Sequence, residues 1–358
     1  MRGSRLMACR RADPQAGPAG LALLAVIACG MVLGASWDPP CAWADEPPAA
    51  DVAIRSLLDE PDGLIDLALS PNGQRLYGLS TDGETVVSLA CGRNASAEVR
   101  TVIEGESADG PGRSIGCIDS SVVAILRDTP ATVITTHRIP PPPEAAVASS
   151  PLQRVALDDA PPTAAASATS TAGLTVSHTR NWLAVTTPPA AVLRAAIAGV
   201  RLGSLSPRNC PELAAGVDVR AAAVSPADEL VLVTASSETA SAGQPPSTHS
   251  LSMYATPGGW ELLRLDTGLS DVRDACFTTA SGSLWVITGG VASADPPQPS
   301  GLWRLDAALH NRRQAINAVL VTALEAPLAV TAGSDEVLYA LVEDGRRVVE
   351  IRPPAAHD

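Results

Sequence analysis

The sequence predicts an all-β fold made of one unit repeated about six times, and two observations lead to this prediction. Short runs alternate apolar and polar residues, as half-buried strands do, and clusters of Gly, Pro, Asn and Asp separate them. A first strand followed by Ser or Thr also recurs, and three of these residues, Ser225, Thr278 and Thr331, are equally spaced. A unit of about 50 residues with four antiparallel strands is the blade of a β-propeller.

The stretch at residues 64–89 is the clearest copy of the unit, with three alternating runs separated by Ser-Pro-Asn-Gly and Thr-Asp-Gly turns. We expect a single propeller of six blades. Seven blades stay open as an alternative if residues 117–203 hold a further degenerate unit. The other five copies have their first strands around Cys117, Leu174, Ala222, Ala275 and Leu328.

The last copy lacks a fourth strand, because its alternating runs end at Arg352. We expect residues 52–58, near the other end of the chain, to supply it, since a blade shared by the two ends closes the ring and removes its open edges. By contrast, the copy that begins at Val219 shows all four strands, at residues 219–224, 230–233, 249–254 and 260–265.

The turn at residues 70–73, followed by Leu76 and Tyr77, resembles the Ser-Pro-Asp-Gly and Leu-Tyr-Val pattern of YVTN and WD-repeat-like bacterial β-propellers. Residues 225–228 match it in part, Asn72 replaces the usual Asp, and the other four blades lack the motif. The resemblance implies a propeller. It also implies that lactonase-like hydrolases and quinoprotein-type dehydrogenases are among the relatives, whose complete sets of channel residues are not matched here.

Residues 1–44 have the order of a secretory signal peptide. Four arginines precede an apolar run at residues 20–36, and Ala42-Trp43-Ala44 supplies the small residues of a cleavage site. We therefore expect one propeller domain at residues 45–358, in the periplasm or secreted, without membrane insertion after cleavage. The alternatives are a lipoprotein processed at Cys29 and an uncleaved membrane anchor. Residues 140–150 and 160–173, rich in Pro, Ala, Ser and Thr, are expected to form flexible loops.

An even number of cysteines follows residue 44, and in an oxidising compartment this predicts two disulfides. Three pairings are possible, of which we favour Cys91 with Cys117 and Cys210 with Cys276. No CxxC motif or Cys/His cluster has the spacing of a zinc site, so no metal is expected.

A formal net charge of −13 makes nucleic acids and anionic membranes poor partners. The chain has no lysine, which excludes Schiff-base chemistry and a P-loop. No G-x-S-x-G elbow occurs either, so we assign no catalytic residue and no cofactor.

A duplicated tripeptide carries the main site hypothesis: Asp218-Val219-Arg220 recurs as Asp271-Val272-Arg273, followed by Asp274. Propeller loops from strand b to c and from strand d to the next strand a share one face around the channel, and the b to c loops at residues 235–248 and 290–301 are long. Because arginine forks bind carboxylates or phosphates, we predict that blades four and five form a recognition face. The alternative is that each Asp and Arg form an ion pair between blades.

His178 stands where the repeat motif has Pro, directly after a first strand. It is either a base or metal ligand near one end of the channel, or a turn residue without a role. The candidate ligand- or partner-binding residues are thus Arg220, Arg273, Asp218, Asp271, Asp274 and His178. We expect a monomeric, non-catalytic scaffold that binds a protein partner or a small acidic ligand, with a periplasmic propeller enzyme as the alternative.

Overall fold

The computed structural model describes the chain from residue 52 to residue 353, with gaps. The predicted signal peptide, Cys29 and most of the second flexible stretch lie outside the described residues. Within them no helix is long and apolar enough to cross a membrane. The gaps are residues 60–62, 93–98, 106, 128–131, 142–145, 149, 157–172, 188–190, 215, 237–247, 257, 295, 311–312 and 334–335.

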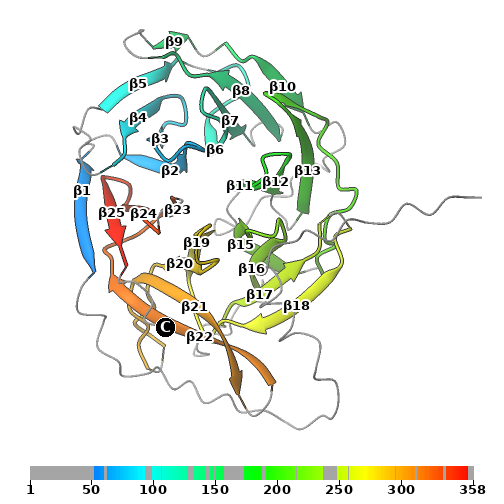
Figure 1. Ribbon diagram of the computed structural model, residues 1–358, viewed down its shortest axis with the longest axis vertical. Coiled ribbons are helices and arrows are strands. Elements are labelled where there is room, and N and C mark those ends of the chain that lie inside the picture. Colours follow the sequence, from blue (N-terminus) through cyan, green and yellow to red (C-terminus); the bar gives the residue numbers. More distant parts are fainter. Residues whose placement is uncertain are drawn as a thin grey trace, which may run out of the picture.

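Six sheets stand around a central axis, each with its first strand innermost (Figure 1). The fold is a six-bladed β-propeller, as predicted. Blade 1 holds β2 (Leu64–Leu69), β3 (Arg75–Ser80), β4 (Val86–Ala90) and β5 (Val99–Glu104). Blade 2 holds β6 (Gly112–Asp119), β7 (Val122–Arg127), β8 (Val133–Arg138) and β10 (Gln153–Ala156). Blade 3 holds β11 (Gly173–Val176), β12 (Trp182–Thr187), β13 (Ala191–Ala198) and β14 (Arg201–Leu202).

The second half of the ring follows the same plan. Blade 4 holds β15 (Val217–Val224), β16 (Leu230–Ser236), β17 (Ser250–Tyr254) and β18 (Glu261–Asp266). Blade 5 holds β19 (Val272–Phe277), β20 (Leu284–Thr288) and the long hairpin of β21 (Gly301–His310) and β22 (Arg313–Ala323). Blade 6 holds β23 (Ala329–Ala332), β24 (Leu338–Val342) and β25 (Arg347–Arg352), with β1 (Ala53–Asp59) outermost.

The two ends of the described chain share blade 6, which confirms the predicted closure. Strand β1 pairs antiparallel with β25. Side chains reinforce the backbone pairing, because Arg55 lies 2.8 Å from the buried carboxylate of Glu350 and Arg347 lies 2.8 Å from Asp59. The two ends of the described chain are therefore fastened in one blade, which closes the ring.

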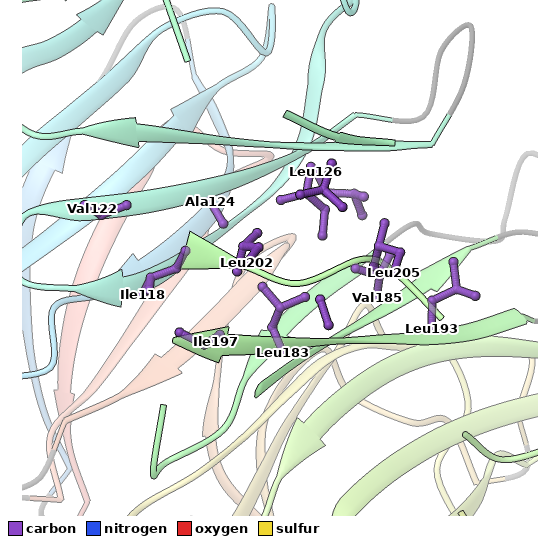
Figure 2. Packing of buried hydrophobic residues seen from close by; sticks show 13 residues of the cluster. Ile118, Val122, Ala124, Leu126, Leu183, Val185, Leu193, Ile197, Leu202 and Leu205 are labelled. Atoms are coloured by element: carbon purple, nitrogen blue, oxygen red, sulfur yellow. The ribbon is translucent and has the colours of Figure 1, made fainter. Parts of the chain in front are cut away.

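The core is divided into six apolar layers, each between two neighbouring blades. Figure 2 shows the layer between blades 2 and 3, where Leu126 of β7 lies near Leu183 and Val185 of β12. Burial of such side chains contributes about 1.5–3 kcal/mol each. Because every blade packs on both faces, a sequence with strongly apolar inner strands forms this ring rather than separate sheets.

The prediction of two disulfides is wrong, because all four cysteines of the described chain are free thiols. Each thiol belongs to a different layer of the core. Cys91 packs between blades 6 and 1, Cys117 between blades 1 and 2, Cys210 between blades 3 and 4, and Cys276 between blades 5 and 6. Burial raises the pKa of Cys117 to about 12, as expected of a thiol that serves as an apolar core group.

Part of the Pro-rich region between β8 and β10 forms a strand. Strand β9 (Val147–Ala148), inside the stretch expected to be a flexible loop, adds to β5 of blade 1 in parallel. Strand β10 follows and completes blade 2 by pairing with β8. The excursion at residues 140–150 thus connects the third and fourth strands of blade 2.

Candidate functional site

Four inner strands carry a β-bulge near their start, and the bulged residue is an arginine in three of them. The register shifts lie between Leu64 and Asp66, Gly112 and Ser114, Val219 and Ala221, and Val272 and Asp274. A bulge re-aims the extra side chain. The residues at these equivalent positions are Ile65, Arg113, Arg220 and Arg273.

The inner strands of all six blades enclose a central channel with a volume of about 630 Å³. Ligand pockets for small molecules have about 300–1,000 Å³. Arg113, Arg220 and Arg273 line this channel at the end where the connections from one blade to the next arrive. Blades 2, 4 and 5 therefore each place one arginine at the same channel mouth.

The duplicated Asp-x-Arg motif forms two ion pairs, each within one blade and between residues two positions apart. Arg220 lies 3.7 Å from Asp218, and Arg273 lies 3.4 Å from Asp271. The alternative predicted ion pairs between blades. The ion pairs do form, but each one joins the bulged arginine to an aspartate of the same blade. The contact of Arg273 with the next blade is a hydrogen bond to the carbonyl oxygen of Pro327, at 3.2 Å.

A glycine at the end of the second strand of blade 5 makes room for this arginine. A Cβ atom at Gly289 would collide with the Asp271 carboxylate and the Arg273 guanidinium group. The hydrogen bonds of Arg273 to Asp271 and Pro327 use two of its five N–H donors. The loop at residues 290–301 also holds this region, because the buried Gln298 side chain exchanges two hydrogen bonds with the Ser270 backbone.

Asp274 and Asp66 each link two neighbouring inner strands by hydrogen bonds, and we call such a side chain a clip. The carboxyl group of Asp274 accepts hydrogen bonds from the backbone N–H groups of Ala275 at 2.8 Å and Val330 of blade 6 at 2.7 Å. That of Asp66 accepts from the N–H of Leu67 at 2.7 Å and from blade 2 through the N–H of Ile115 at 2.8 Å.

Ser114 holds the corresponding position in blade 2 and continues the series. Its hydroxyl group donates to Asp66 at 2.5 Å and accepts from the N–H of Leu174 in blade 3 at 3.1 Å. The residue that follows the bulge therefore links three pairs of neighbouring blades around the channel, namely blades 1 and 2, blades 2 and 3, and blades 5 and 6.

Burial changes the protonation of both clips. It raises the pKa of Asp66 to about 6, against the hydrogen bonds that lower it. Burial, and then the charge of Asp66, raises the pKa of Asp274 to about 8. At pH 7 Asp274 is therefore mainly a neutral carboxylic acid and Asp66 mainly a carboxylate.

His178 lies at the other end of the channel, after β11, and is not brought together with Arg220 or Arg273. Its Nε2–H donates to the carbonyl oxygen of Val224 at 2.9 Å, and burial lowers its pKa. In the described part of the chain no three His, Cys, Asp or Glu residues are grouped as metal ligands. The geometry gives His178 the place of a turn residue that joins blades 3 and 4.

No protein-family model and no curated protein matches the chain. Solved structures do. A Trichoderma reesei protein of carbohydrate-active enzyme family AA12 is 13% identical, with a TM-score of 0.57, over 86% of this chain and 97% of that chain. The PQQ domain of pyranose dehydrogenase from Coprinopsis cinerea is 12% identical, with a TM-score of 0.57, over 86% and 96%. At this identity the similarity shows the propeller fold alone, and no specific repeat family is identified.

The sequence comparison missed Arg113 and Asp66. The pairing of β6 with β7 extends one residue further than in the counterpart strands, and β6 has a second bulge between Cys117 and Asp119. More residues therefore separate Arg113 from the Ser that follows its strand, and Arg113 does not align with Arg220 when the copies are aligned on their Ser. Asp66 had a usable signal, because it precedes Ser70 by the same interval as Asp274 precedes Thr278.

Proposed function

We propose that this protein binds a small anion bearing carboxylate or phosphate groups in its central channel, through Arg113, Arg220 and Arg273. One observation carries the proposal: three arginines enter the channel from the same bulge position of three inner strands. Guanidinium groups recognise carboxylates and phosphates through paired hydrogen bonds. Their convergence from separate blades favours a ligand with more than one anionic group.

The contrast between the channel mouth and the whole molecule supports a small ligand. The chain has a formal net charge of −13, whereas three arginines gather at this mouth, where ion pairs with Asp218 and Asp271 offset the charges of two of them. An acidic exterior repels polyanions such as nucleic acids, whereas a small anion inside the channel meets the arginines at close range. The volume of about 630 Å³ suits a ligand of metabolite size.

A binding role agrees with the rigidity of the scaffold. The arginines project from strands that are paired on one side and packed on both faces, and Arg273 is further held by Asp271 and Pro327. Positions fixed before the ligand arrives lower the cost of binding. A propeller enzyme with a bound cofactor is the second candidate, since the structures similar in fold include the PQQ domain of a pyranose dehydrogenase.

Isothermal titration with citrate, succinate and phosphate tests the proposal. We expect binding of at least one of these anions and no binding of glucose. The double variant Arg220→Ala, Arg273→Ala should lose at least tenfold in affinity, because two charged contacts are removed. An absorption spectrum of the purified protein tests the second candidate, for which a bound chromophore is expected.

The matched control is Arg264→Ala, Arg304→Ala, which removes the same charge from ion pairs on β18 and β21, the fourth strand of blade 4 and the third strand of blade 5. Its affinity should equal that of the wild type. Absence of anion binding by the wild type, or an equal loss in the control, would contradict the proposal.

A further inference from the structure

Asp274 is a buried carboxyl group beside the proposed anion site. It follows the bulged Arg273 directly on β19 and lines the same channel. Each of its carboxyl oxygens accepts one backbone N–H, from Ala275 and from Val330. A carboxyl oxygen has two lone-pair positions, so each one keeps a position for a proton.

Among the charged groups around Asp274, the one that shifts its pKa is another carboxylate, Asp66. On its own strand Arg273 turns to Asp271 and Pro327, and on β15 Arg220 lies near Asp218. The adjoining strands β20 and β23 carry no titratable side chain. From β2, the negative charge of Asp66 acts on Asp274. The buried thiol of Cys276 is the other titratable neighbour on β19.

We propose that Asp274 is a specificity-determining residue of the channel, which as a neutral acid donates a hydrogen bond to an oxygen of a bound carboxylate. This inference rests on the proposed anion-binding function and names carboxylates as its ligand class. The arginines attract the anion. An ionised Asp274 would repel the carboxylate of the ligand, whereas the protonated Asp274 does not and donates a hydrogen bond to it. The pKa of about 8 is consistent with this role, because the proton is held at neutral pH.

The inference predicts that binding is linked to a proton. Above pH 8 the free Asp274 ionises, so binding must be accompanied by the uptake of one proton from the solvent at Asp274. The affinity of the wild type for citrate should therefore be constant near pH 7 and fall by up to about tenfold per pH unit above pH 8. Arginine stays charged and citrate is essentially a trianion above pH 8, so neither produces the slope there.

Calorimetric titration of citrate from pH 7 to pH 9.5 tests the inference with two variants. Asp274→Asn keeps a neutral group that donates, so its affinity should be independent of pH. Asp66→Asn is the matched control, which removes the corresponding carboxyl group of blade 1. It should keep the slope but begin it at lower pH, because Asp66 raises the pKa of Asp274. An unchanged slope in Asp274→Asn would overturn the inference.

A measurement on the wild type keeps the inference testable if Asp274→Asn does not fold. Citrate binding at pH 8.5, measured in buffers of different ionisation enthalpy, should show proton uptake. Binding without uptake and with the same affinity from pH 7 to pH 9.5 overturns the role of Asp274 and leaves the anion site standing. Absence of citrate, succinate and phosphate binding at every pH overturns both.

Discussion

Blades 1 and 5 use the same inner-strand position for the same structural task but surround it differently. Asp66 and Asp274 both follow a bulge and both accept N–H groups from the next blade. The bulged residue is Ile65 in blade 1 and Arg273 in blade 5. The clip therefore belongs to the scaffold, and the two blades differ in the bulged residue before it and in the number of donors that it accepts.

The largest expected effect separates the two clips by stability. Asp66→Ala leaves three donors without their acceptor, namely the N–H groups of Leu67 and Ile115 and the hydroxyl of Ser114, whereas Asp274→Ala leaves two. Buried donors without a partner cost about 1–3 kcal/mol each. We expect losses of about 3 kcal/mol for Asp66→Ala and about 2 kcal/mol for Asp274→Ala in urea unfolding. Equal losses would contradict the clip assignment.

An intermediate effect concerns the space beside each bulge. Thr288 and Ser80 occupy the same register position, so Gly289 of blade 5 corresponds to Thr81 of blade 1. Gly289→Ala should displace the Arg273 guanidinium and weaken citrate binding by about tenfold, or about 1.4 kcal/mol. The matched variant Thr81→Ala should leave the affinity unchanged. Wild-type affinity in Gly289→Ala would show that Arg273 does not need its present position.

The smallest effect is a slope of stability with pH. A carboxyl group whose pKa is raised by folding stabilises the fold while it is protonated, and this contribution is lost as the pH rises towards the folded pKa. Asp66 has largely ionised by pH 7, so the slope between pH 7 and pH 8 belongs mainly to Asp274. In this window the unfolded chain loses histidine protons, which opposes the slope, and cysteine protons, which adds to it, because burial lowers the pKa of His137 and His249 to about 4 and raises the pKa of the buried cysteines.

We therefore expect the free energy of unfolding to fall by about 1 kcal/mol from pH 7 to pH 8, within the limit of 1.36 kcal/mol per unit for one proton. Urea unfolding at the two pH values measures it. Asp274→Asn should remove most of the decrease, and Asp66→Asn should keep part of it. A stability that rises with pH over this interval would contradict the protonation of Asp274.

Much of the ring could be predicted from the sequence, because the strand signals are local. The period-two runs placed the inner strands, and the missing fourth strand of the last unit led to the pairing of β1 with β25. The spacing argument was less accurate at the end of the chain. Gly333, rather than Thr331, takes the place of Ser225 and Thr278, since its N–H bonds to Val337 as theirs bond to Glu229 and Ser283.

The site was only half predictable. The duplicated Asp-Val-Arg led to Arg220 and Arg273, which do line the channel. Arg113 was hidden by the second bulge of β6, because bulges change the count of residues without changing the apolar pattern. The disulfide prediction failed for a related reason: the number of cysteines carries no information on which layer of the core each one joins.

The sequence by itself determined the strands, their grouping into units and the strand that closes the ring, since alternation and turn residues act over a few neighbours in the chain. Only the tertiary structure decided which residues meet across the channel. Arg113, Arg220 and Arg273 are far apart in sequence and converge because the ring places equivalent bulges around one axis. The raised pKa of Asp274 likewise comes from burial and from the charge of Asp66 in another blade, and no local pattern encodes either.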